Sequence, residues 1–266
     1  MKAELIEAMG SDLTVVNAAR VSFDKESEWA RFDCHECQNS VKKACSDNCD
    51  CVKQGARTDG PTLSVGDSKL ISYLAKHGHF TPFTHPQITL RETVPIFVAR
   101  QRFKHVVGFT YNEVSRRYVD DEPKFYVPEV WRSRPEGSVK QGSGLNGIVK
   151  VPYKVCINKD RVEDTEPEYR KEMVPVDNVV KYVNAAALSA YKALISGGVA
   201  PEQARMVLPQ SMYTSYYVTG SLAAFARMCK QRLDPHAQHE IQELAKMVDE
   251  IIRPLYPESW KALMGE

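Results

Sequence analysis

The hydrophobic period changes at Pro95, and this change constrains the fold more than any other feature of the sequence. Between residues 87 and 93, apolar Ile88 and Leu90 alternate with polar neighbours, which is typical of a strand with one buried face. Proline is favoured in the first turn of a helix, and PIFVARQRF follows from Pro95 with good helix formers. The sequence therefore predicts a strand that leads directly into a helix.

The C-terminal part of the chain follows helical spacing. A helix is predicted from Val176 to Gly197, and Pro201 is expected to open the next one. Two further helices fit residues 221–231 and 236–252. Together these patterns predict an α+β fold with a helix-rich C-terminal half.

Two more helices are predicted closer to the N-terminus. Ser11 is a suitable N-cap for a helix that ends near residues 20–22. Asp67 is the expected N-cap of another helix, which Gly78 closes. Irregular or extended structure is expected over residues 124–131.

Composition favours one enzyme-sized domain over residues 1–266. The chain is 43% hydrophobic, and its 35 Lys and Arg residues nearly balance 34 Asp and Glu residues. This balance argues against nucleic acid or a membrane surface as a partner. The N-terminus lacks the pattern of a secretory signal, and no apolar run approaches about 18 residues, so a cytoplasmic location is expected.

Two stretches interrupt these patterns and are predicted to be insertions. The first, at about 25–66, contains five of the seven cysteines, spaced C-x2-C-x7-C-x3-C-x-C from Cys34 to Cys51. This spacing predicts a structural zinc site, with a loop of free thiols as the alternative. Its ligands would be Cys34, Cys37, Cys45 and Cys49. The second insertion, at about 132–174, is polar and is predicted to be loop or hairpin.

A dense group of cations and neutral donors lies between Arg100 and Arg117. Arginine offers forked donors that suit phosphate, and Asn112 and Ser115 add hydrogen-bonding groups beside Glu113. A nucleotide is the ligand that fits this mixture. The alternative interpretation is a solvated helix face followed by a charged loop.

The segment KHVVGFTYNEVSRR resembles the motif R-H-R-x-x-S-x-N-E-x-S-x-R of flavin-dependent thymidylate synthases. The second half matches from Asn112 to Arg117. In the first half Lys104 replaces the first arginine, His105 is retained, and Val106 stands in place of the second arginine, with one extra residue before Thr110. The segments MGSDLTVVNAARVSFD, LAKHGHFTPFTH, ARMVLPQSMYT and RLDPHAQHEIQ resemble the same family in the same order.

This resemblance implies the family's fold, with a central, mostly antiparallel sheet, and its activity. dUMP, 5,10-methylenetetrahydrofolate and NADPH would give dTMP, tetrahydrofolate and NADP on bound FAD, in a homotetramer with sites between subunits. Arg232 would be the catalytic residue, because it holds the pyrimidine and favours its ionised N3 form.

The resemblance also implies two sets of contacts. Residues expected at FAD are Ser22, His79, Thr81, Lys104, His105, Val106, Glu113, Ser221 and Arg227. Residues expected at dUMP are Gln101, Arg102, Lys104, Glu113, Val114, Ser115, Arg116, Arg117, Arg205 and Arg232. Arg102 is included because it is close enough in the sequence to compensate for the fork that Lys104 lacks.

Other interpretations remain open from the sequence alone. The spacing of His77, His79 and His85 also suits a metal, although the family resemblance favours flavin. No nucleophilic cysteine is expected, since Cys156 falls in an apparent strand and Cys229 fits a packing position in a helix. A zinc-stabilised nucleic-acid-binding module, or a nucleotide- or flavin-binding family member without turnover, are the alternatives to a synthase.

Overall fold

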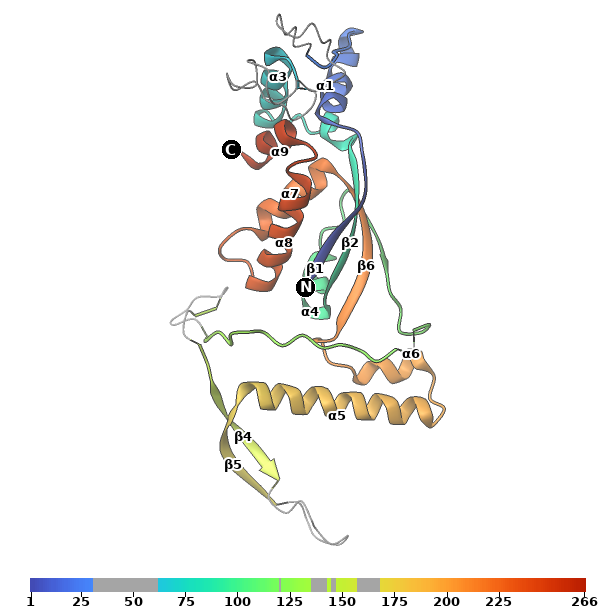
Figure 1. Cartoon of the computed structure of the whole chain (residues 1–266), viewed down its shortest axis with the longest axis vertical. Coiled ribbons are helices and arrows are strands. Elements are labelled where there is room, and N and C mark those ends of the chain that lie inside the picture. The colour runs from blue at the N-terminus through green and yellow to red at the C-terminus, as the bar shows by residue number, and fades with distance from the viewer. Residues whose placement is uncertain (31–61, 120, 135–142, 145–146, 157–167) are drawn as a thin grey trace, which may run out of the picture.

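A twisted antiparallel sheet forms the centre of the molecule. The computed structural model describes residues 1–30, 62–119, 121–134, 143–144, 147–156 and 168–266. Four strands pair in the order β1 (Lys2–Met9), β2 (Gln87–Pro95), β6 (Tyr213–Ser221) and β3 (Phe109–Glu113). A separate antiparallel hairpin of β4 (Lys150–Cys156) and β5 (Tyr169–Pro175) lies away from this sheet (Figure 1).

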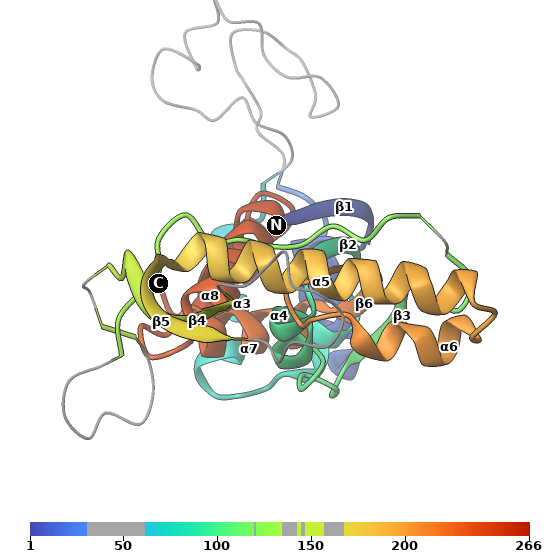
Figure 2. The ribbon, with the colours of Figure 1, turned by 90° about the horizontal axis from the view of Figure 1, so that it is seen from below.

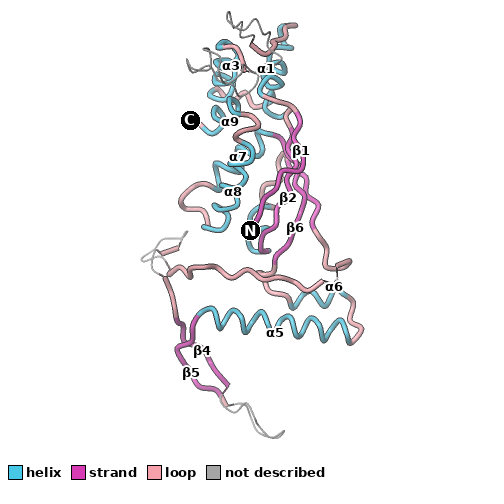
Figure 3. The backbone as a smooth tube through the Cα atoms, viewed as in Figure 1, coloured by secondary structure: helices cyan, strands magenta, loops and turns pink. Residues whose placement is uncertain are grey.

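Helices cover one face of the sheet and both ends of the molecule. Their bounds are α1 (Asp12–Arg20), α3 (Val65–Lys76), α4 (Ile96–Arg102), α5 (Val176–Ser196), α6 (Pro201–Ala204), α7 (Leu222–Arg232), α8 (His239–Ile252) and α9 (Pro257–Met264). Helices α7 and α8 lie beside the strands, whereas α1, α3 and α9 gather at the upper end (Figure 3). Helix α5 crosses the width of the molecule below the sheet, with α6 alongside it (Figure 2).

The alternation in β2 buries one face of that strand, as its sequence predicts. Ile88, Leu90 and Val94 have no exposed surface, and they pack in a core that includes Val218 of β6 and Phe225 of α7. The opposite face of β2 and β6 is polar. Across it, Thr89 and Thr219 share a hydrogen bond of 2.9 Å. One face of the sheet is therefore core, and the other is available to polar ligands.

Helices α4 and α7 each begin where a central strand ends. Pro95, the last residue of β2, is the N-cap of α4 rather than a residue of its first turn. Ser221, the last residue of β6, caps α7 by accepting a hydrogen bond of 3.2 Å from the Ala224 amide. Because β2 and β6 are antiparallel, the two helices start at opposite ends of the strand pair.

The expected N-cap of α3 is corrected by the structure. Ser64 is the N-cap and accepts from the Asp67 amide, while Asp67 lies in the first turn. The Asp67 carboxylate is buried and binds Arg20 at 2.6 Å and Ser27 at 2.9 Å. The Ser64 hydroxyl is the third side chain that donates to this carboxylate. Asp67 therefore joins α3 to the end of α1 instead of starting the helix.

Three strands of the sheet were not predicted from the sequence. Strand β1 and strand β3 lie at the edges and are largely exposed, so they carry no strong hydrophobic alternation. Strand β6 does alternate, with Thr214, Tyr216 and Val218 facing inward, but two of these three residues have a polar group.

The two predicted insertions differ in how far the structure describes them. The expected hairpin in the second insertion is confirmed by β4 and β5, and Cys156 belongs to β4. Most of the first insertion, with Cys34, Cys37, Cys45 and Cys49, lies outside the described residues. Among the helices that the structure describes, none is both long and apolar enough to cross a membrane.

Candidate active site

An open cavity of about 1220 Å³ lies where the polar face of the sheet meets the segment after β3 and the 3-10 turn at Arg205–Val207. Its cationic lining consists of Arg91, Arg100, Arg116, Lys124 and Arg205, and its acidic lining of Glu113, Asp121, Glu122 and Glu202. A cavity of this size with several convergent charged groups suits a nucleotide-sized ligand.

Five of the residues expected at dUMP come together in this cavity: Glu113, Val114, Ser115, Arg116 and Arg205. Strand β3 pairs with β6 as far as Glu113, whose carboxylate accepts a bond of 2.6 Å from the Thr214 hydroxyl. The chain then leaves the sheet, which turns Ser115 and Arg116 towards the cavity. Arg116 is held in place by Asp121, at 3.3 Å from its carboxylate. The remaining cations are exposed and able to receive an anion.

Two arginines in the cavity were not assigned from the sequence. Arg91 lies on the polar face of β2 and donates from Nε to the Ser215 hydroxyl at 3.2 Å. Arg100 lies on the exposed side of α4. The position of Arg91 could have been predicted from the alternation of β2, which puts this residue on the face opposite Ile88 and Leu90.

Gln101 and Arg232 line a different cavity, of about 1050 Å³, together with His236 and Gln242. The two cavities share no lining residue. Arg117 lines neither cavity and stacks its guanidinium on the Tyr118 ring at 4.9 Å. Within one chain, five of the expected dUMP residues thus line the first cavity and two line the second, while Arg102, Lys104 and Arg117 line neither.

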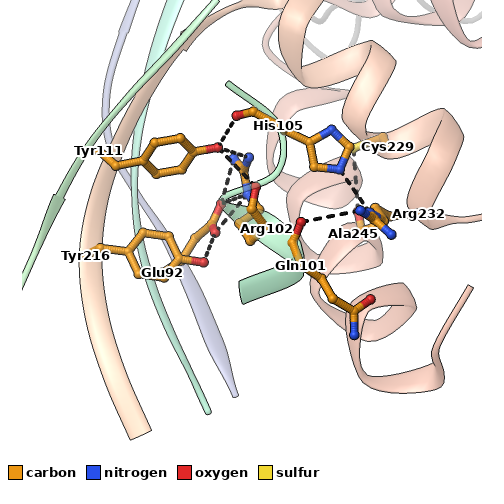
Figure 4. A network of polar contacts seen from close by, with 9 residues as sticks. All are labelled: Glu92, Gln101, Arg102, His105, Tyr111, Tyr216, Cys229, Arg232 and Ala245. Carbon is orange, nitrogen blue, oxygen red and sulfur yellow. Dashed lines mark hydrogen bonds and ion pairs between the residues drawn. The ribbon is translucent and has the colours of Figure 1, made fainter. Parts of the chain in front are cut away.

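His105 and Arg232 contact each other where α4 and α7 end (Figure 4). The Arg232 Nε donates to His105 Nε2 at 2.9 Å, and its Nη2 donates to the Gln101 carbonyl at 3.3 Å. Burial, followed by the charges of Arg232, Arg102 and Arg227, lowers the pKa of His105 to about 4. The ring is therefore neutral near pH 7, and its Nε2 can accept the hydrogen bond from Arg232.

The structure places Arg102 in the interior instead of the nucleotide site. Its side chain has no exposed surface and pairs with Glu92, at 3.1 Å between Nε and Oε2. It also donates to the Tyr111 hydroxyl at 2.8 Å and lies 4.5 Å from the centre of the Phe109 ring. Because the guanidinium is buried and bonded to Glu92 and Tyr111, Arg102 does not replace the missing fork at Lys104.

The residues expected at FAD fall into two groups. Ser22, His79 and Thr81 are exposed at the end of the molecule where α1 packs against the 3-10 helix Thr81–Thr84. Figure 1 shows α1 at the opposite end of the long axis from α6. The second group, which contains Lys104, His105, Val106, Ser221 and Arg227, lies in the segment after α4 and at the N-cap and in the first half of α7, whereas Glu113 lies in the first cavity.

The second group surrounds an exposed apolar surface. Val106 and Val107 are each 65% exposed, Lys104 is exposed beside them, and Arg227 donates to the Val107 carbonyl. Gly108 has φ +78°, and a Cβ on it would be 2.9 Å from the Ala224 Cβ, so only glycine fits there without a shift. Apolar surface flanked by cations suits a flat ring system that carries phosphates.

Candidates for a metal site and for a nucleophile include His77, His79, His85 and Cys229. Among the described residues, these histidines included, no group of three metal-ligating side chains gathers. Burial raises the pKa of Cys229 far above its usual range, and its thiol contacts the Ala245 carbonyl at 3.8 Å. The packing role expected for Cys229 is confirmed.

The fold and the cavity define an α+β protein with an open, charged cavity beside an antiparallel sheet. Residues 4–258 match the family model described as Thymidylate synthase complementing protein, and the chain belongs to that family. It is therefore an enzyme of the flavin-dependent thymidylate synthase class, as its motif predicts.

Curated relatives agree with this assignment, and a solved structure shares the fold. The chain is 30% identical over 260 residues to the flavin-dependent thymidylate synthase of Thermosipho africanus, covering 98% of this chain and 89% of that protein. It is 31% identical over 261 residues to that of Thermotoga neapolitana, with the same coverage. The UMP/dUMP methylase PolB from Streptomyces cacaoi, bound with 5-Br dUMP, shares the fold with a TM-score of 0.65. Its sequence identity is 24%, over 99% of this chain and 94% of that one.

The depressed pKa of His105 predicts a pH dependence of stability. Below about pH 6.5 an unfolded histidine binds a proton that the native ring excludes until about pH 4. The free energy of unfolding should therefore fall by up to about 3 kcal/mol as the pH drops from 6.5 to 4, and His105→Gln should remove this slope. Urea unfolding of both proteins across this range measures the difference. The exposed His85→Gln serves as control; equal slopes for the wild type and His105→Gln would contradict the prediction.

Proposed function

We propose that this chain converts dUMP, 5,10-methylenetetrahydrofolate and NADPH to dTMP, tetrahydrofolate and NADP with bound FAD. The observation that carries the proposal is the gathering of Glu113, Ser115, Arg116 and Arg205 around one cationic cavity. Glu113 and Ser115 occupy defined positions of the motif by which the chain resembles the family, and the chain belongs to that family.

The cavity residues suit a nucleoside monophosphate. The Ser115 hydroxyl, Arg116 and Arg205 provide donors for phosphate oxygens, and Arg91 adds a further cation on the sheet. Glu113, fixed by Thr214, offers a carboxylate that can accept from a sugar hydroxyl. These contacts orient the nucleotide but supply no reactive group of their own.

Arg232 would act on the pyrimidine. Its guanidinium is fixed by the His105 ring and the Gln101 carbonyl and still lines an open cavity. A fixed cation beside the ring stabilises negative charge at N3, and such preorganised charge lowers a barrier because it needs no rearrangement during the reaction.

The flavin would be held beside Val106 and Val107, with Lys104 and Arg227 near its phosphates. When bound, it supplies the hydride that the reductive methylation requires. The Ser221 hydroxyl accepts a hydrogen bond from the Ala224 amide at the start of α7. It would therefore contact the cofactor while keeping this bond. NADPH as the reductant and a cytoplasmic location are inferred from the resemblance to the family.

This proposal predicts a yellow protein with a flavin absorbance band that NADPH bleaches. With folate and NADPH it should release tritium from 5-labelled dUMP, and Arg232→Ala should lower kcat by about 10²- to 10³-fold. The exposed Lys246→Ala on α8 is the control and should retain full activity. A colourless protein without tritium release would refute the function, whereas full activity of Arg232→Ala would refute only the role of that residue.

We infer that the active unit is a homotetramer whose sites form between subunits. Arg205 and Arg232 line separate cavities of one chain, and Ser22, His79 and Thr81 lie at a third place. Helix α5 also has only Asn184 and Tyr191 buried among its 21 residues, which leaves much of its apolar surface available to another chain.

Shared sites predict complementation between two inactive variants. Arg205→Ala and Arg232→Ala chains, co-expressed with different tags, should form mixed oligomers in which about one site in four contains both intact halves. Tritium release should then recover to roughly a quarter of the wild-type value. Mixed oligomers as inactive as either parent would show that both arginines come from the same chain.

We also propose a structural zinc bound by Cys34, Cys37, Cys45 and Cys49, on the basis of their spacing. Purified protein should contain close to one zinc per chain by elemental analysis, and Cys34→Ser should lose it. Cys229→Ser is the matched control, since this cysteine is buried in the core. Less than about 0.2 zinc per chain in the wild type would refute the site.

A further inference from the structure

A network of buried polar groups lies directly behind the contact between His105 and Arg232 (Figure 4). Glu92 of β2 and Arg102 of α4 have no exposed side-chain surface, and their carboxylate and guanidinium are bonded to each other. Tyr216 of β6, the register partner of Glu92, donates its hydroxyl to the Glu92 carboxylate at 2.6 Å. Tyr111 of β3 accepts from Arg102 on the other side. The network thus joins three strands and one helix.

Among the residues that the structure describes, one short hydrogen bond leads from this network towards the site. The Tyr111 hydroxyl lies 2.6 Å from the His105 carbonyl and 3.2 Å from the Arg102 carbonyl, so its single proton is directed to His105. Burial, opposed by the Arg102 charge, raises the pKa of Tyr111 to about 12, which keeps this hydroxyl a donor. The main chain at His105 is thereby attached to the buried ion pair.

Stability alone does not account for such an arrangement. A buried ion pair stabilises the folded state little more than well-packed apolar residues do, because the cost of desolvating both charges offsets their attraction. The positions would suit apolar side chains, since Glu92 alternates with Leu90 and Val94 on the core face of β2. Hydrogen bonds between polar groups fix the orientation of their partners, which apolar contacts cannot do. Lys104, Val106 and Val107 around His105 are exposed, so side-chain packing does little to hold this segment, and hydrogen bonds such as those from Tyr111 and Arg227 position it.

We propose that Glu92, Arg102, Tyr111 and Tyr216 form a positioning unit, which fixes the main chain at His105 and, through the His105 ring, the guanidinium of Arg232. The inference rests on the proposed function, because Arg232 matters only if it faces the substrate. None of the four residues touches the nucleotide; each acts through its neighbour.

Tyr111→Phe is the sharpest test, because it removes one hydroxyl and keeps the ring contacts with Phe103 and Tyr216. In flavin-loaded enzyme, kcat for tritium release from dUMP should fall at least about tenfold, with a smaller change in KM. The freed His105 ring should also return towards its ordinary pKa near 6.5. A new acidic limb near pH 6 should then appear in the activity profile, which a mere loss of folded protein would not produce.

The double variant Glu92→Leu/Arg102→Met separates positioning from stability. It replaces the buried pair by apolar groups, so the protein should fold with an unfolding midpoint close to that of the wild type. Its kcat should nevertheless fall by a factor similar to that expected for Tyr111→Phe. Wild-type activity in a stable double variant would overturn the proposal.

A second readout does not depend on turnover. Diethyl pyrocarbonate modifies neutral, accessible imidazoles, and His105 is only 6% exposed with its Nε2 engaged by Arg232. Peptide mass spectrometry should show His105 modified at least about fivefold faster in Tyr111→Phe than in the wild type. Unchanged modification of His105 would overturn the positioning role whatever the activity. If the wild type itself releases no tritium from dUMP, the proposed function fails, while the modification rates still report on the network.

Discussion

The antiparallel pairing of β2 with β6 is the constraint on which the rest of the structure depends. Nine residue pairs, from Gln87 with Ser221 to Pro95 with Tyr213, join segments more than a hundred residues apart in the sequence. Each strand passes directly into a helix, α4 after β2 and α7 after β6. Because the helices start at opposite ends of the pair and return over the same face, their C-terminal ends meet. That meeting brings Arg232 to Gln101 and His105.

The same pairing divides the sheet into two chemical environments. Its core face is mostly apolar, and Glu92 and Tyr216 on it are register partners that form the buried network with Arg102. Its other face presents Arg91, Thr93 and Ser215 to the large cationic cavity. One strand, β2, therefore contributes alternate residues to the support of Arg232 and to the nucleotide site.

Elements with strong local signals were predictable, and those defined by distant partners were not. The alternation of β2, the helical spacing of α5, α7 and α8, and the motif through Arg117 are properties of neighbouring residues. Edge strands β1 and β3 form because β2 and β6 offer hydrogen-bonding partners, so their largely exposed sequences gave no signal. Glu92 could have been recognised from its place on the apolar face, but its partner Arg102 looked like a phosphate ligand until its burial was known.

The sequence by itself determined the family and the reaction class, because a linear motif and its order along the chain carry that information. It also determined which residue types are present for a nucleotide. Only the tertiary structure decided which arginines can reach a ligand, since burial and pairing depend on contacts between segments that are remote in the sequence. Arg102 became an internal support, Arg91 became part of the cavity, and Arg205 and Arg232 were separated onto different surfaces of one chain.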